Sequence, residues 1–145
     1  MTVLFLVHVI TTVMVAGMMW FVQVVHYPLL PHVGHGSFVS YEKAHTRLAI
    51  ATVVPLMVIE TVTGGLLVLW RPRGVGLVPC WIGLVLLAII WWSTFRLQVP
   101  QHRILSRGFD DDASRRLVRS NWIRTGSYSV RILVMLWMLT GILRG

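Results

Sequence analysis

The chain turns at HYPLLPHVGHGSFVSYEKAH, His26 to His45, a segment that lies between two long apolar stretches. The segment contains four of the six histidines of the chain, and Glu42 lies three residues before His45. If the two apolar stretches cross a membrane in succession, the end of the first and the start of the second lie at the same membrane face. The sequence therefore predicts that His26, Glu42 and His45 share one depth, as the start of a metal or cofactor site.

The composition is that of a membrane protein. Of the 145 residues, 56% are hydrophobic and 12% are charged, which is too apolar for a soluble domain of this size. The stretches long enough for a bilayer core, which needs about 20 apolar residues, are Val3–Tyr27, Ala44–Trp70, Val75–Leu97 and Ser127–Leu143. The first stretch lacks a basic start and a small-residue cleavage site, so we expect it to be retained. We predict an all-α integral-membrane four-helix bundle, antiparallel, with a single domain over residues 1–145.

The net charge of +8 is distributed unevenly between the two predicted membrane faces. Arg71, Arg73 and Arg144 lie on the side of the N-terminus. The basic residues on or near the other side are Lys43, Arg47, Arg96, Arg103, Arg107, Arg115, Arg116, Arg119 and Arg124. Because cytoplasmic loops are enriched in Lys and Arg, we predict a bacterial inner-membrane protein with both termini on the non-cytoplasmic side. The charge then sets the topology and attracts anionic membrane lipids, and we expect no nucleic-acid partner.

Several residues predict where helices begin, end or bend. Pro28 is expected to stop the first span. Ser40 is a candidate cap for the second helix, and the aspartates at 110–112 for the fourth. Pro100 is expected to kink the third helix and direct His102 toward the bundle interior.

Two charged residues fall inside the apolar spans. Glu60 lies in the second span and Arg131 in the fourth. A carboxylate at membrane depth must be protonated, paired or next to a polar cavity. Two interpretations stay open at this stage: a structural Glu60–Arg131 pair that the long arginine side chain makes possible, or a proton-handling role for Glu60.

Each predicted helix has polar residues at its cytoplasmic end. In chain order they are Gln23 and His26, Glu42 and His45, Gln98 and His102, and Asn121 and Arg124. Imidazoles and a carboxylate at one depth are suitable ligands for iron, copper or zinc. We predict that His26, Glu42, His45 and His102 bind an iron or copper ion. Gln23, Gln98 and Asn121 would orient these ligands, and Arg124 would stabilise an anionic oxygen or a substrate phenolate.

The alternatives to a metal centre are a haem and a protein without enzymatic function. A haem b would use two of His26, His45 and His102 as axial ligands, with arginines next to its propionates. A small structural or assembly protein would place the same histidines at the membrane interface without function. A channel or transporter would need a polar path to the outer face, which the apolar run from Val9 to Val22 disfavours.

Tryptophans and methionines near the predicted site indicate the kind of substrate. They are Met18, Met19, Trp20, Trp91, Trp92 and Trp122, and they would make the surroundings dry and apolar. We therefore expect a membrane-embedded metal-dependent oxidoreductase or oxygenase that acts on a quinone, an aromatic molecule or a lipid. Homo-oligomerisation stays open. Hydrolase, P-loop, dinucleotide-binding and Cys-based zinc motifs do not occur in the sequence.

Several motifs resemble those of known membrane proteins. At HYP, YEKAH, FRLQVPQHRIL, GFD and RLVRSNWIRT the chain resembles a widespread group of small four-span bacterial membrane proteins. The element around Asn121, Arg124 and Thr125 is similar to the anthrone-oxygenase-like membrane family, which implies oxidation of aromatic or polyketide-type substrates. The run MMWFVQVVHYPLL resembles the first span of four-span bacterial protoporphyrinogen oxidases, a haem-binding family whose equivalent histidine would be His26.

Overall fold

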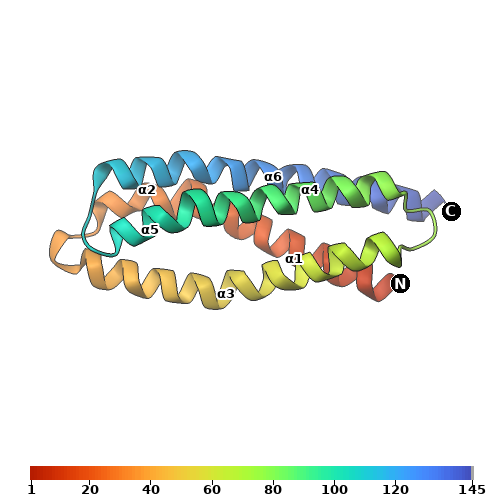
Figure 1. The fold of residues 1–145 in the computed structure, drawn as a ribbon, viewed down its shortest axis with the longest axis horizontal. Coiled ribbons are helices and arrows are strands. Elements are labelled where there is room, and N and C mark those ends of the chain that lie inside the picture. Colours follow the sequence, from red (N-terminus) through yellow and green to blue (C-terminus); the bar gives the residue numbers. More distant parts are fainter. Residues whose placement is uncertain (145) are drawn as a thin grey trace.

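The protein is an elongated bundle of helices in the computed structural model, which describes residues 1–144 (Figure 1). The first rod consists of α1 (Thr2–Phe21), the π-helical turn η1 (Val22–His26), α2 (Tyr27–Leu29) and the 3-10 turn η2 (Leu30–His32). The second rod is α3 (His35–Leu69). The third consists of α4 (Leu77–Ser93), the π-helical turn η3 (Thr94–Gln98) and α5 (Val99–Leu105), and the fourth is α6 (Asp111–Arg144).

All four rods are long and apolar enough to cross a membrane, as predicted. Their bounds are Thr2–His32, His35–Leu69, Leu77–Leu105 and Asp111–Arg144. The two chain termini lie at one end of the bundle, and the turns after α2 and α5 lie at the other (Figure 1). We call the latter the turn end.

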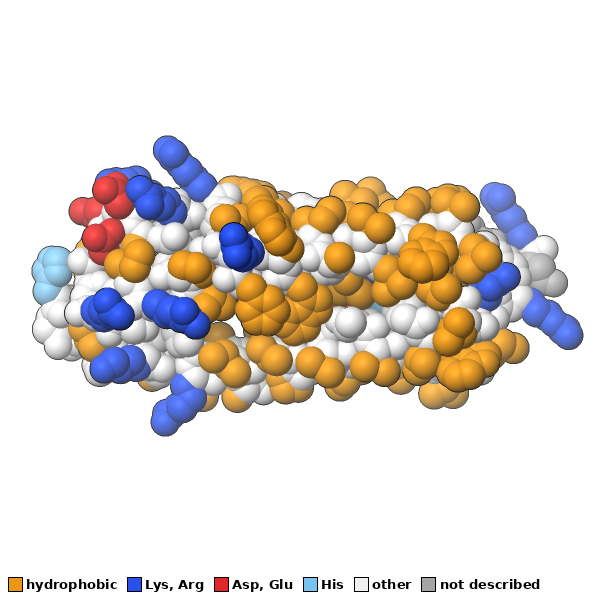
Figure 2. Space-filling view, viewed as in Figure 1, with side chains coloured by type: hydrophobic (Ala, Val, Ile, Leu, Met, Phe, Trp, Pro, Cys, Tyr) orange, Lys and Arg blue, Asp and Glu red, His pale blue; other side chains and the backbone are white. Residues whose placement is uncertain are grey.

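The outer surface of the bundle is apolar over most of its length. Side chains such as Trp81, Leu133 and Leu69 are 56%, 64% and 69% exposed. Figure 2 shows hydrophobic side chains over the middle of the molecule and toward the termini, and a group of Lys and Arg side chains at the turn end. By contrast, several polar and charged side chains, among them Glu60 and Arg131, are buried in the interior. This distribution is expected for a protein whose outer surface faces lipid rather than water.

Each of the two π-helical turns lies just before a proline. Pro28 follows η1 by two residues, and Pro100 follows η3 by two residues. A proline ring clashes with the carbonyl group four residues earlier, and one turn of wider π helix relieves that clash. The prediction that Pro28 ends the first helix is therefore wrong, because η1 lets the rod continue to His32. A kink at Pro100 was predicted, and the structure has a π-helical turn there, at Thr94–Gln98.

The helix starts agree with the sequence at α6 and differ at α3. Asp110 Oδ1 accepts a hydrogen bond from the Ala113 N–H at 2.7 Å, so the predicted aspartate cap of α6 is confirmed. Ser40 was predicted to cap the second helix, but α3 begins at His35, and Ser40 lies inside it. The earlier start buries Phe38 completely against Phe109, with ring centroids 5.0 Å apart. Tertiary packing thus lets this helix begin earlier than the predicted cap at Ser40.

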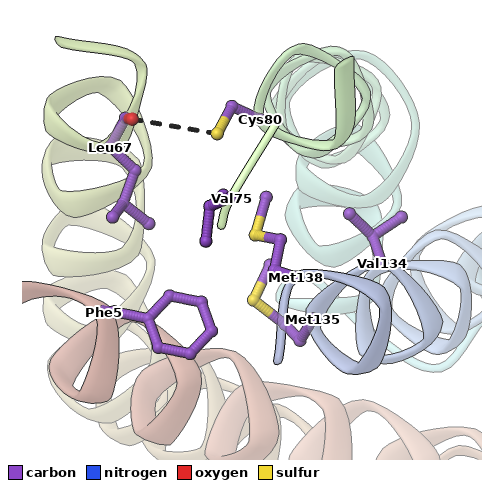
Figure 3. Packing of buried hydrophobic residues seen from close by; sticks show 7 residues of the cluster. All are labelled: Phe5, Leu67, Val75, Cys80, Val134, Met135 and Met138. Carbon is purple, nitrogen blue, oxygen red and sulfur yellow. Dashed lines mark hydrogen bonds between the residues drawn. The ribbon is translucent and has the colours of Figure 1, made fainter. Parts of the chain in front are cut away.

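The core consists of apolar clusters that follow one another along the bundle. Near the termini, Phe5, Leu67 and Met135 pack with Cys80, whose thiol lies 3.7 Å from the Leu67 carbonyl oxygen (Figure 3). A second cluster around Met57 lies in the middle, and a third lies at the turn end. The polar residues described below lie among these clusters.

The connection between α3 and α4 depends on glycine. Gly74 has a φ of +83°, a backbone conformation that residues with a side chain rarely adopt. A Cβ atom at Gly74 would lie 2.1 Å from the backbone oxygen of Gly141. This turn therefore packs directly on the end of α6 and closes the bundle at the termini.

Candidate functional site

The interior contains two groups of buried polar side chains. The first, which we call the central network, consists of His8, Thr12, Glu60, Thr63, Tyr128 and Arg131. The second lies toward the turn end and is called the histidine cluster. Its members are His26, Tyr27, Glu42, His45, His102 and Arg124.

The central network is built on an ion pair between Glu60 and Arg131, both completely buried. Arg131 Nε and Nη2 donate to Glu60 Oε1 at 3.0 and 2.8 Å. The structural pair that the sequence analysis left open is therefore present. A buried carboxylate and guanidinium compensate one another only if their remaining polar atoms are also satisfied.

The other atoms of the pair are satisfied by all four rods. Glu60 accepts hydrogen bonds from the Thr12 hydroxyl at 2.7 Å and from the Tyr128 hydroxyl at 3.1 Å. Arg131 Nη1 donates to the Gly83 carbonyl in α4. Among residues 1–144, no side-chain atom of the central network is buried without a hydrogen-bond partner. The network therefore connects the four rods and has no free group for a ligand.

His8 belongs to this network as a neutral ring. The Thr63 hydroxyl donates to the Ile59 carbonyl at 2.8 Å, so His8 Nδ1 donates to Thr63 Oγ1 at 2.8 Å. His8 Nε2 then accepts from Arg131 Nη2 at 3.3 Å. The sequence analysis gave His8 no role. The signal it missed was polar residues three or four apart on three spans: His8 with Thr12, Glu60 with Thr63, and Tyr128 with Arg131.

In the histidine cluster, hydrogen bonds join a carboxylate, an imidazole and a phenol in a row. His102 Nδ1 lies 2.6 Å from Glu42 Oε1, and Glu42 is completely buried. The Tyr27 hydroxyl lies 3.2 Å from His102 Nε2, on the other side of the same ring. With Nδ1 donating to the carboxylate, Nε2 accepts from the phenol. This is the arrangement in which a carboxylate orients a histidine that acts as a base. The sequence analysis gave Tyr27 no role in it.

The other two histidines extend the cluster toward the surface between α1 and α3. The rings of His26 and His45 stack with centroids 4.2 Å apart, and those of His45 and His102 lie 5.6 Å apart. Glu42 and the three predicted histidines are thus brought together from three rods. His26 Nε2 is buried and has no hydrogen-bond partner in the described part of the chain.

The predicted amides do not contact the histidines. Gln23 accepts a hydrogen bond from Asn121 at 2.9 Å and donates to the Val118 carbonyl at 3.2 Å. Gln98 donates to the hydroxyls of Ser93 and Ser120 at 3.0 and 3.2 Å. Contrary to the prediction that Gln23, Gln98 and Asn121 orient the histidines, these bonds join the π-helical turns to α6 and to α4. They hold η1 and η3 in place, which positions Tyr27 and His102 just beyond.

Arg124, the member of the histidine cluster that α6 contributes, is almost completely buried, with 7% of its surface exposed. It lines a cavity of about 350 Å³ together with Tyr27, His45 and His102. The opposite walls are apolar and include Val53 and Met57 of α3. Cavities of this size and composition, with a few polar groups on one side, are typical of small-molecule sites.

A second cavity, of about 630 Å³, lies between α1 and α3 and is lined by His26, Tyr41 and Gly17 among mostly apolar residues. The two cavities share four lining residues: Val22, His45, Ala49 and Val53. His45 therefore lies between a groove on the side of the bundle and the inner cavity.

The side chains predicted to bind a metal or a haem lie close together but do not surround a common position. Within residues 1–144, no three or more His, Cys, Asp or Glu side chains are arranged to hold a metal ion. An imidazole binds a metal in the plane of its ring, so His26 and His45, stacked at 23°, do not share a ligand position. Nor does their separation leave room for a haem between them. His102 has both nitrogens in contact with Glu42 and Tyr27. These rings would have to rotate to bind iron, copper or haem. The reaction proposed below therefore uses none of these groups.

No protein-family model matches the chain, and neither a curated protein nor a solved structure matches it. The resemblances noted in the sequence therefore stay predictions, and the function is argued from the site.

Proposed function

We propose that the protein is a membrane-embedded oxidoreductase that acts on a hydrophobic aromatic or quinone-like molecule. The bundle would lie in the bacterial inner membrane, with antiparallel spans, both termini outside and the turn end cytoplasmic. The observation that supports this function best is the Glu42–His102–Tyr27 array, which borders a cavity with apolar walls. Quinones and phenols exchange protons when they exchange electrons, and the array supplies the proton part of such a reaction.

The array would act as a general acid and base. A hydroxyl of the bound molecule gives its proton to the Tyr27 oxygen, and Tyr27 passes its own proton to His102 Nε2. Glu42 stabilises the imidazolium that forms and keeps Nδ1 protonated, so it is a positioning residue. The reverse transfer would return a proton to the anionic oxygen of a bound quinone after an external electron carrier has reduced it. Burial of the carboxylate and the phenol keeps water away from this exchange.

The experiment uses 2-naphthol, an apolar phenol whose ionised form absorbs at longer wavelength than its neutral form. The protein is reconstituted in lipid nanodiscs, and the absorption of the bound probe is compared with its absorption in empty nanodiscs at the same pH. We expect a larger ionised fraction in the presence of protein. His102→Gln should reduce that fraction about tenfold, since it removes the proton acceptor.

The control is His35→Gln, which removes an exposed histidine at the start of α3 and should leave the spectrum unchanged. Glu42→Gln is a second variant, because it keeps a hydrogen-bond acceptor for His102 but removes the charge. Bound 2-naphthol that remains neutral in the wild type, or an ionised fraction that is the same in His102→Gln, would contradict the proposed function.

A further inference from the structure

Arg124 is a buried cation without an anionic partner. Only 7% of its surface is exposed, and its Nε atom is buried with no hydrogen-bond partner. The ion pairs within residues 1–144 join His102 to Glu42, Arg115 to Asp112 and Arg131 to Glu60, so none includes Arg124. A buried charge is costly unless it is paired. The protein as described thus lacks a group that Arg124 would bind.

The surroundings of Arg124 favour a ligand as that missing group. The cavity of about 350 Å³ that it lines also includes Arg103, and no aspartate or glutamate is among its lining residues. The acid of the histidine cluster, Glu42, forms its ion pair with His102 at 2.6 Å and none with Arg124. The lining of the cavity therefore combines two arginines with mostly apolar side chains and contains no acid.

The shape of a guanidinium group limits the chemistry of the head group. Its N–H donors form a planar fork that matches two oxygens of a carboxylate, and it also binds a single phenolate oxygen well. The apolar wall formed by Met19, Val53 and Met57 suits a hydrocarbon or aromatic body. The groove between α1 and α3 shares Val22, Ala49 and Val53 with this cavity, so the cavity lies directly beside the outer surface of the bundle.

We propose that the cavity binds an amphiphilic anion, with a carboxylate or phenolate on Arg124 and an apolar body against α3. The inference rests on the proposed function, because the same cavity would hold the substrate of the Glu42–His102–Tyr27 array. It adds a requirement for negative charge that the array alone does not impose.

The test compares two probes with the same aromatic body. 2-Naphthoate is an anion, and 2-naphthamide is a neutral molecule of nearly the same shape. Their affinities for the protein in nanodiscs are measured by calorimetry, after subtraction of binding to empty nanodiscs. We expect the wild type to bind 2-naphthoate about tenfold to a hundredfold more tightly than 2-naphthamide, as hydrogen bonds to a charged group predict. 2-Naphthol, measured in parallel, separates a phenolate from a carboxylate preference.

Arg124→Gln should abolish the preference for 2-naphthoate while 2-naphthamide still binds. Arg124→Lys keeps the charge without the planar fork and should retain part of the preference. The matched control is Arg119→Gln, which removes an exposed arginine from the same helix and should leave both affinities unchanged.

Two results would overturn the inference, and they differ in what they say of the proposed function. If both probes bind the wild type equally, or if Arg124→Gln keeps the preference, the anion requirement is wrong and the cavity remains a site for neutral molecules. If neither probe binds the wild type, the cavity is not a binding site and the proposed function fails as well.

Discussion

Arg124 and Arg131 lie seven residues apart on α6, two helical turns along one face, and yet their surroundings are opposite. Arg131 contacts Glu60, Thr12, His8 and a backbone carbonyl, and each of its three side-chain nitrogens has a hydrogen-bond partner. Arg124 has no ion-pair partner among the described residues and faces a cavity. The comparison teaches that a buried arginine in an apolar helix marks a structural pair where its partners are internal. Where they are missing, it marks a candidate binding site.

The same contrast extends to the two groups of residues around these arginines. The central network is fully satisfied, so removing one of its members leaves a charge or polar group uncompensated inside the bundle. The histidine cluster has unsatisfied atoms at His26, Glu42 and Arg124. Substitutions in the first group should therefore change stability, whereas those in the second should change ligand binding.

The largest effect on stability is expected from Arg131→Met. It leaves the completely buried Glu60 without its cation, which should lower the free energy of unfolding by about 3–5 kcal/mol. Unfolding in mixed detergent and SDS micelles, followed by far-UV circular dichroism, measures this change. The double variant Glu60→Leu with Arg131→Met should recover part of the loss. An Arg131→Met protein as stable as the wild type would show that the Glu60–Arg131 pair does not stabilise the fold.

A smaller loss is expected when a histidine of the central network is removed. His8→Ala removes one hydrogen-bond partner of Thr63 and one of Arg131 Nη2, so we expect a loss of about 1–3 kcal/mol by the same measurement. The matched variant is His45→Ala, whose ring makes stacking contacts only and lines both cavities. It should cost less than His8→Ala and should alter probe binding instead. The reverse order would contradict the division into two groups.

The smallest change in stability is expected for Arg124→Met without ligand. Because Arg124 has no counter-charge to lose, the free energy of unfolding should stay within about 0.5 kcal/mol of the wild type or increase. A loss comparable to that of Arg131→Met would show that Arg124 holds the fold together, and the comparison between the two arginines would then break down.

Composition and periodicity were sufficient to predict the four apolar spans, since the bilayer sets both length and polarity. The Asp110 cap was also predictable, because it depends on neighbouring residues only. The start of α3 was not, because it depends on burial of Phe38 against Phe109, far away in the sequence. The continuation past Pro28 required a π-helical turn, whereas the proline by itself is equally compatible with the end of a helix.

The candidate site was predicted in outline from the sequence. The threading of consecutive spans was enough to group His26, Glu42, His45 and His102 at one end of the bundle. Which nitrogen contacts which oxygen depends on side-chain packing, so the Tyr27–His102–Glu42 order was not foreseen. The central network as a whole was not predicted, for the same reason, although the Glu60–Arg131 pair within it was one of the two interpretations left open.

The most direct test of the account is a crystal structure of the protein with 6-bromo-2-naphthoate, whose bromine atom is located by anomalous scattering. The account predicts that the carboxylate lies within hydrogen-bond distance of the Arg124 guanidinium and that the bromine lies among the apolar residues of α3. An Arg124 side chain that pairs with a residue of the protein itself, with the bromine found elsewhere, would contradict it.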